Sequence, residues 1–226
     1  MRGSKTDNKN IELLKLTSHL RDHIDVERII GLNADALRRS DISAALLGHL
    51  QMSALDSLAI CICKMFESSN RNELNSIPGI IASLAGMNLS ENQREQFSVF
   101  GRKYGNRCEP VEGRSSLEGT FGLFCGVHSE SLNRLKEFRD RFGAHSESRA
   151  AIKSLPPQAE LECFFEFARD FYEIISRSVN NVGPAVIPRK VGHGLVRLIE
   201  SMGVRPAKFY FDEEDREAPR PTSGCS

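Results

Sequence analysis

Long stretches in which apolar residues recur every three or four positions dominate this chain. The clearest follows Pro156-Pro157, where the apolar side chains form one broad stripe with helical spacing: Leu161, Phe164, Phe165, Ala168, Phe171, Tyr172, Ile175 and Val179. We expect this stripe to face a hydrophobic core and Gly183-Pro184 to end the helix. Because polar loops and Gly or Pro residues separate several such stretches, the pattern predicts an all-α protein.

The same spacing and the capping residues set the other expected boundaries. Ser90-Glu-Asn-Gln93 fits a capping box that opens a helix to about Tyr104. Pro78 lies in the first turn of a short helix. The expected elements are a helix over 11–30 that stops at Gly31, a central helix over 41–66, a short helix over 77–84, an irregular segment over 101–113, a short apolar piece over 120–126, and helices over 129–144 and 186–202.

We expect these helices to form an antiparallel bundle with four to five core helices, short extra helices and a C-terminal extension. Residues 1–8 are expected to be a disordered lead, and residues 9–183 the bundle. Residues 184–211 are expected to form a C-terminal helix followed by a docked segment, Lys208-Phe-Tyr-Phe211. Residues 212–226 are acidic and then rich in Pro and Ser, so we expect a disordered tail.

Composition places the chain among globular proteins. Hydrophobic residues make up 40% of its 226 residues and charged residues 27%. Lys plus Arg equals Asp plus Glu, at 30 each, so net charge favours no class of partner. The N-terminus lacks the apolar segment of a secretory signal, and no apolar run reaches the roughly 18 residues of a membrane span. We therefore expect a cytoplasmic protein, without membrane contact, whose six cysteines are reduced and mostly buried.

The helix expected over 129–144 carries an arginine on its apolar face. A turn of about 100° per residue groups its apolar side chains in one arc about 120° wide: Leu132, Leu135, Phe138 and Phe142. Arg139 falls inside this arc, and His145 lies within about 20° of its edge if the helix continues through Gly143. Because an unpaired buried guanidinium is costly, we expect an internal carboxylate, a facing subunit or an anionic ligand to compensate Arg139.

The residues alone leave two interpretations of this pair open. In the first, Arg139 pairs with a glutamate of a neighbouring helix and His145 is a satisfied core residue. In the second, the pair is a functional site, because a neutral histidine can take a proton near pH 7 and a guanidinium fits phosphate oxygens. Such a pair, with no metal ligands nearby in the sequence, suits RNA cleavage by internal attack of the 2′-hydroxyl. His145 would act as general base or acid and Arg139 would hold the phosphate.

The stretch from Arg139 to His145, with Asp140 directly after the arginine, resembles the R-x(4–6)-H signature of the HEPN superfamily (higher eukaryotes and prokaryotes nucleotide-binding). Residues 135–145, together with 57–66 and 75–78, resemble its abortive-infection-associated, AbiU-like branch, and the likeness spans about 10–180. The resemblance implies a homodimer in which two Arg/His pairs line one cleft. It also implies a metal-independent endoribonuclease acting on RNA, often a toxin or phage-defence component, with Asp140 as an orienting neighbour and an antitoxin or other regulatory protein as a further partner.

One residue departs from this pattern. Many toxins of the superfamily carry a tyrosine two residues after the histidine, which a partner nucleotidyltransferase modifies. This chain has Glu147 there, which argues against that form of control.

Basic residues surround the pair and have two readings, a phosphate-tracking patch or a mixed-charge helix face: Arg134, Lys136, Arg141 and Arg149. His19 and His23 are four apart but lack an obvious third ligand, so we expect no metal site and no cofactor. His128 is expected to be a loop or capping residue, and the alternative is an accessory residue of the site. The alternative function is a non-catalytic helical module that binds a nucleotide, RNA or a protein partner through the same cleft.

Overall fold

The protein is built from helices in every part of the chain that the structure describes. The structure is a computed structural model, and it describes residues 5–40, 44–68, 75–106, 113–144, 155–183 and 185–207. These residues contain no strand, which confirms the all-α class. The helices are α1 (Lys5–Arg39), α2 (Ala44–Phe66), α3 (Ile77–Ser83), α4 (Glu91–Lys103), α5 (Gly113–Val127), α6 (Ser129–Ala144), α7 (Gln158–Ser178) and α8 (Lys190–Ser201).

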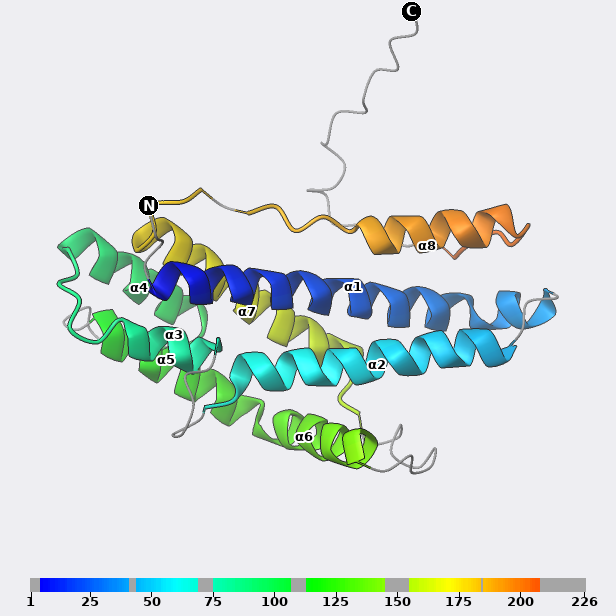
Figure 1. Cartoon of the computed structure of the whole chain (residues 1–226), viewed down its shortest axis with the longest axis horizontal. Coiled ribbons are helices and arrows are strands. Elements are labelled where there is room, and N and C mark those ends of the chain that lie inside the picture. Colours follow the sequence, from blue (N-terminus) through cyan, green and yellow to red (C-terminus); the bar gives the residue numbers. More distant parts are fainter. Residues whose placement is uncertain are drawn as a thin grey trace, which may run out of the picture.

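The longest helix, α1, is the element around which the others are arranged. α2 runs back along α1, α7 crosses behind them, and α8 lies along the C-terminal half of α1 (Figure 1). α6 packs on α2, while α4 packs on α5 and α7. α6, which carries Arg139 and Asp140, therefore lies at the edge of the molecule, supported by α2.

Several boundaries were predicted correctly because local chemistry determines them. The capping box is present: the Ser90 hydroxyl accepts from the Gln93 N–H, and the Gln93 side chain accepts from the Ser90 N–H. Pro78 lies in the first turn of α3. α6 has the predicted bounds, and α7 begins directly after Pro157 as predicted. α7 ends at Ser178, however, about five residues before the predicted end at Gly183-Pro184.

The predicted limits of the first helix are wrong at both ends. α1 begins at Lys5, so residues 5–8 are helical rather than disordered, and it continues through Gly31 to Arg39. Contacts with α3 hold its first turns: Thr6 bonds to Ser83 at 3.1 Å, and the Lys9 ammonium donates to the Gly79 carbonyl. Packing of the neighbouring turns against α2 and α8 outweighs the roughly 1 kcal/mol cost of a glycine in a helix.

Two other predicted boundaries also need correction. α5 is a helix of 15 residues from Gly113, where only a short apolar piece from Thr120 was expected. A Cβ on Gly113 would lie 2.9 Å from Leu89, so the glycine permits a close approach of α5 to α4 and its leading loop. The last helix begins at Lys190 rather than at Val186. Its expected continuation, Lys208–Phe211, and the tail after it lie outside the described residues.

A cluster of aromatic rings forms the main core between α2, α4, α5 and α7. Phe167 is fully buried at its centre and stacks on Phe124, with ring centroids 4.1 Å apart. The Tyr104 and Phe100 rings lie 4.7 and 5.5 Å from it. Phe167 lies outside the predicted stripe, so α7 is buried over more of its circumference than its apolar spacing suggested.

A second, smaller core joins the C-terminal half of α1 to α2 and α8. Its buried side chains are Ile29, Leu37, Ile199 and Val204. Leu47 of α2 and Leu195 of α8 pack against it from either side. This small core, rather than the aromatic cluster, holds α8 on the rest of the molecule (Figure 1).

Gly192 allows α8 to approach α1 closely, and this predicts opposite effects for two neighbouring substitutions. A Cβ at Gly192 would lie 2.8 Å from the Asp25 carboxylate, whereas a Cβ at Gly194 would meet nothing within 4 Å. We expect Gly192→Ala to lower the free energy of unfolding by about 1–3 kcal/mol. Gly194→Ala should raise it by up to about 1 kcal/mol through helix propensity. Urea unfolding of both variants is the measurement, and equal stability of the two would contradict this packing.

Asp25 is a buried carboxylate that faces charges from three elements. It is 1% exposed, and neither carboxylate oxygen accepts a hydrogen bond from the described residues. Arg189 and Arg21 lie 3.9 and 4.0 Å away, and Glu162 and Asp22 add negative charge. Burial raises the pKa of Asp25 to about 6, although the two arginines act in the opposite direction.

This raised pKa predicts how stability depends on pH. Between pH 3.8, the ordinary pKa, and about pH 6, the folded protein keeps a proton on Asp25 that the unfolded chain has released. The contribution of Asp25 to stability therefore falls as pH rises through this window. We compare the free energy of unfolding of the wild type with that of Asp25→Asn. The difference, wild type minus variant, should fall by about 2 kcal/mol from pH 4 to pH 7.5. Urea titrations across this range measure it, and a constant difference would refute the assignment.

Among the residues that the structure describes, one helix meets the length and composition of a membrane span, contrary to the sequence expectation. It is the stretch Ala45–Phe66 of α2, of which 39% is buried within the protein. Leu58, Ile62 and Met65 of this stretch are fully buried in the main core. The core helix of a soluble protein has the same properties, so α2 is consistent with a soluble protein.

Candidate functional site

α6 presents Arg139 at the boundary between core and solvent. Leu132, Leu135 and Phe138 of the predicted arc are buried, and the helix includes Gly143 and ends at Ala144. The sequence placed His145 near the apolar arc only if the helix continued through Gly143. The helix does continue through Gly143, and it ends at the residue before His145. The side chain of Arg139 is 29% exposed, so it is half-buried rather than enclosed by the core.

Two carboxylates hold the Arg139 guanidinium. Its Nη1 donates to Glu67 Oε1 at 2.6 Å, and its Nε donates to Asp140 Oδ1 at 2.9 Å. Nη2 lies 2.9 Å from the same Asp140 oxygen. Glu67 directly follows the last residue of α2, and its N–H donates to the Cys63 carbonyl. The sequence left three possible partners open for Arg139: an internal carboxylate, a facing subunit or an anionic ligand. In this structure an internal carboxylate, Glu67, balances its charge.

The surrounding charges keep the arginine ionised and the nearest thiol protonated. Partial burial lowers the pKa of Arg139, but the hydrogen bonds to Glu67 and Asp140 outweigh it, so the pKa is raised overall. Burial raises the pKa of Cys63 to about 11, against the opposing effect of Arg139. Cys63, 1% exposed, is therefore a neutral core thiol at pH 7.

The other predicted site residues divide into three groups. Asp140 contacts Arg139, as expected of an orienting neighbour, and is 66% exposed. Arg134 forms an ion pair with Glu130 one turn earlier, and Lys136 is half-buried. His145 and Arg149, with the side chain of Arg141, lie outside the described residues. The structure therefore brings together Arg139, Asp140 and the unpredicted Glu67.

His128 belongs to the aromatic core rather than to this site. Its ring lies 4.5 Å from that of Phe124 and 5.4 Å from that of Phe164. Its carbonyl accepts the N–H of Leu132 at the start of α6. Because Arg139 lies eleven residue steps after His128, the two are about 16 Å apart along the axis of α6. His128 is thus a packing and helix-start residue.

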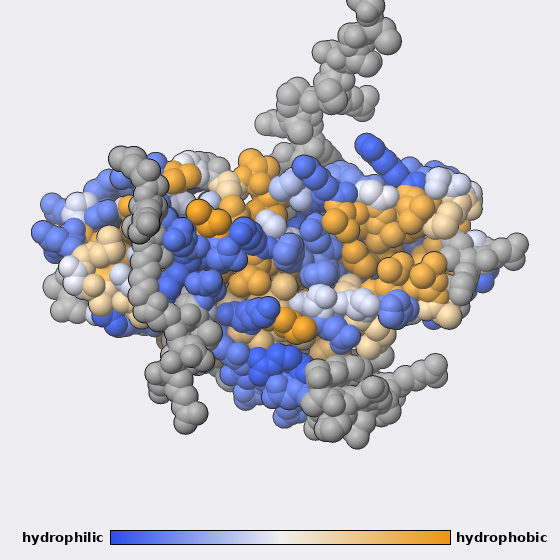
Figure 2. All heavy atoms as spheres, viewed as in Figure 1, coloured by the Kyte–Doolittle hydropathy of each residue, from blue (hydrophilic) through white to orange (hydrophobic). Residues whose placement is uncertain are grey.

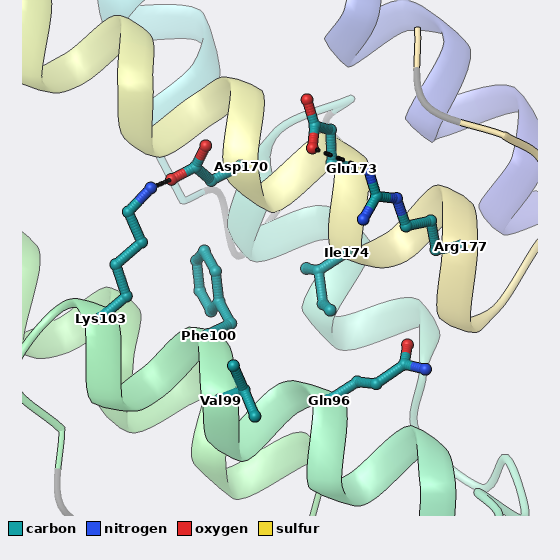
Figure 3. A pocket seen from close by; sticks show the side chains of 8 residues that line it. All are labelled: Gln96, Val99, Phe100, Lys103, Asp170, Glu173, Ile174 and Arg177. Carbon is teal, nitrogen blue, oxygen red and sulfur yellow. Dashed lines mark hydrogen bonds and ion pairs between the residues drawn. The ribbon is translucent and has the colours of Figure 1, made fainter.

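A groove between α4 and α7 is a separate feature that no motif had indicated (Figure 3). It encloses about 480 Å³ and is lined by Gln96, Val99, Phe100, Lys103, Asp170, Glu173, Ile174 and Arg177. Lys103 pairs with Asp170 across it, and Arg177 pairs with Glu173 at 3.6 Å. The charges on its rim are therefore balanced within the groove, and none of its lining residues belongs to the Arg139 site.

Comparisons with known proteins add no assignment to this geometry. No protein-family model, no curated protein and no solved structure matched the chain. Among the described residues, no three His, Cys, Asp or Glu side chains are grouped as metal ligands would be. The features that bear on function are therefore Arg139, its carboxylate partners Glu67 and Asp140, and the sequence motif that continues to His145.

Proposed function

We propose that this protein is a metal-independent endoribonuclease in which Arg139 and His145 carry out the chemistry. Arg139 binds the scissile phosphate, and His145 acts as the general base or acid. The 2′-oxygen attacks phosphorus and the bond to the 5′-oxygen breaks. If His145 is the base, it takes the proton of the 2′-hydroxyl and water protonates the leaving 5′-oxygen; if it is the acid, it protonates that oxygen and water takes up the proton of the 2′-hydroxyl. The products have a 2′,3′-cyclic phosphate and a 5′-hydroxyl.

The observation that carries this proposal is the way Glu67 and Asp140 hold Arg139. A guanidinium has five N–H groups, and the three contacts to carboxylates leave donors for a phosphate on its exposed side. Because these contacts already hold the Arg139 guanidinium in place, less conformational entropy is lost when RNA binds. The likeness to the HEPN signature supports RNA as the substrate, a homodimeric cleft, a cytoplasmic role in toxicity or phage defence, and a regulatory antitoxin.

A second candidate function rests on the same contacts. Glu67 and Asp140 together carry a charge of −2 beside a single arginine, so a phosphate must approach against local negative charge. This repulsion opposes cleavage at a bound phosphate. The second candidate is therefore a non-catalytic helical module that binds a nucleotide, RNA or a protein partner through the same cleft, and of these ligands the protein partner does not need to bring a phosphate against this charge. The two candidates separate by whether RNA is cleaved or only bound.

Substitution of Arg139 tests the proposal with a matched control. We expect Arg139→Ala to slow cleavage of a labelled single-stranded RNA by about 10²- to 10³-fold, the loss typical when one charge-stabilising donor is removed. Arg38→Ala removes the same charge from an exposed pair with Asp35 far along α1 and should leave cleavage unchanged.

Stability separates catalysis from folding in this experiment. A half-exposed ion pair contributes about 1 kcal/mol or less, so Arg139→Ala should remain folded in thermal denaturation. Unchanged cleavage by Arg139→Ala would refute the proposal. RNA binding by the wild type without any cleavage would establish the second candidate instead.

A further inference from the structure

The end of the molecule formed by α1, α2 and α8 exposes an apolar surface. On α8, Val191, Leu198 and Met202 lie on one flank at helical spacing and are 42%, 52% and 38% exposed. On α2, Leu46 and Leu50 lie one turn apart and are 54% and 40% exposed. Figure 2 shows hydrophobic residues gathered at this end. We call these five residues the distal apolar surface.

Both parts of the distal apolar surface border the small core. Leu195 and Leu47 pack into that core from α8 and α2, next to the exposed residues of the same helices. None of the five residues carries a charge, and exposed apolar patches of this kind are usually covered by a partner.

The described chain ends at this same place. Val204 is buried in the small core, and the Ala207 N–H donates to Asn33 Oδ1 at 2.7 Å. Asn33 is 4% exposed, and its Nδ2 donates to the Ile29 carbonyl. Residue 208 therefore starts from a fixed point on α1, between the helices that bear the two parts of the surface.

The residues that follow have the composition to cover an apolar surface. Phe209, Tyr210 and Phe211 are three consecutive aromatic residues, and Asp212-Glu-Glu-Asp215 follows them. Four residues beyond Ala207 span up to about 14 Å, more than the roughly 10 Å diameter of a helix. The aromatic segment can thus reach α8 or α2 without any movement of the described residues.

We propose that the chain's own segment Phe209–Phe211 docks on the distal apolar surface. A tethered segment is present at an effective concentration near the millimolar range, so it occupies the surface ahead of a second copy at ordinary protein concentrations. The docked segment fastens α8 to the α1–α2 hairpin, and its release would expose the surface. This inference does not depend on RNA cleavage.

Hydrogen exchange on the full chain tests the docking. We expect Phe209→Ser/Phe211→Ser to raise the amide exchange rates of peptides covering α8 and residues 46–50 by about ten-fold, because docking suppresses local opening. Peptides of α6 should exchange at the wild-type rate. Unchanged exchange rates in α8 would overturn the proposal. It would also be overturned if the protection of α8 against exchange fell on dilution in both wild type and variant, because a second copy of the chain would then cover the surface.

A double-mutant cycle locates the contact. Leu198→Ser should accelerate exchange in α8 less when the two phenylalanines are already replaced, because both changes remove the same contact. Leu123→Ser, an exposed leucine on α5, should add independently to the tail substitutions. Equal additivity for both leucines would place the segment elsewhere and overturn the proposal.

Discussion

Replacing His145 with alanine is expected to slow RNA cleavage by about 10²- to 10⁴-fold, the usual contribution of a general acid or base. The reason is chemical: His145 is the one residue of the motif that can exchange a proton near neutral pH. α6 includes Gly143 and ends at Ala144, the residue before His145. A gel assay with end-labelled RNA measures the rate.

A matched control and a pH profile make this result specific. His19→Ala removes an exposed histidine from α1 and should leave the rate unchanged. The wild-type rate should depend on pH around pH 6.5, roughly the ordinary pKa of histidine, and this dependence should disappear in His145→Ala. A variant with wild-type rates at every pH would exclude His145 from the chemistry.

Phe167→Ala is expected to cause the largest loss of stability of any single substitution considered for this chain. Phe167 is fully buried, and its ring stacks on Phe124 at 4.1 Å and lies 4.7 Å from Tyr104. Loss of its burial together with the cavity left behind should lower the free energy of unfolding by about 3–5 kcal/mol. Urea denaturation followed by circular dichroism measures it.

The neighbouring residue provides the control. Glu166 lies on the same turn of α7 but is exposed, so Glu166→Ala should change stability by about 0.5 kcal/mol or less. A loss below 1 kcal/mol for Phe167→Ala would mean that the aromatic cluster is not the main core.

Features set by local chemistry could be predicted from the sequence. The capping box at Ser90 and Gln93 and the apolar arc of Leu132, Leu135 and Phe138 depend only on spacing and hydrogen-bonding type. The phase of α6 also indicated that Arg139 needs compensation, and the structure supplies it.

Features set by tertiary neighbours could not be predicted in this way. Glu67 lies 72 residues before Arg139, and nothing in its local pattern identifies it as the partner. Phe167 lies outside the expected stripe because α4 and α5 cover a second side of α7. Gly31 does not end α1, since packing on both sides of the helix outweighs its low propensity.

The most direct test of the account is the chemical nature of the RNA ends produced with a metal chelator present. We expect 2′,3′-cyclic phosphate and 5′-hydroxyl ends from the wild type, detected by mass spectrometry, and the same ends formed at least about 10²-fold more slowly by Arg139→Ala and His145→Ala. Products with 3′-hydroxyl and 5′-phosphate ends, or cyclic phosphate ends made at the wild-type rate by either variant, would contradict it.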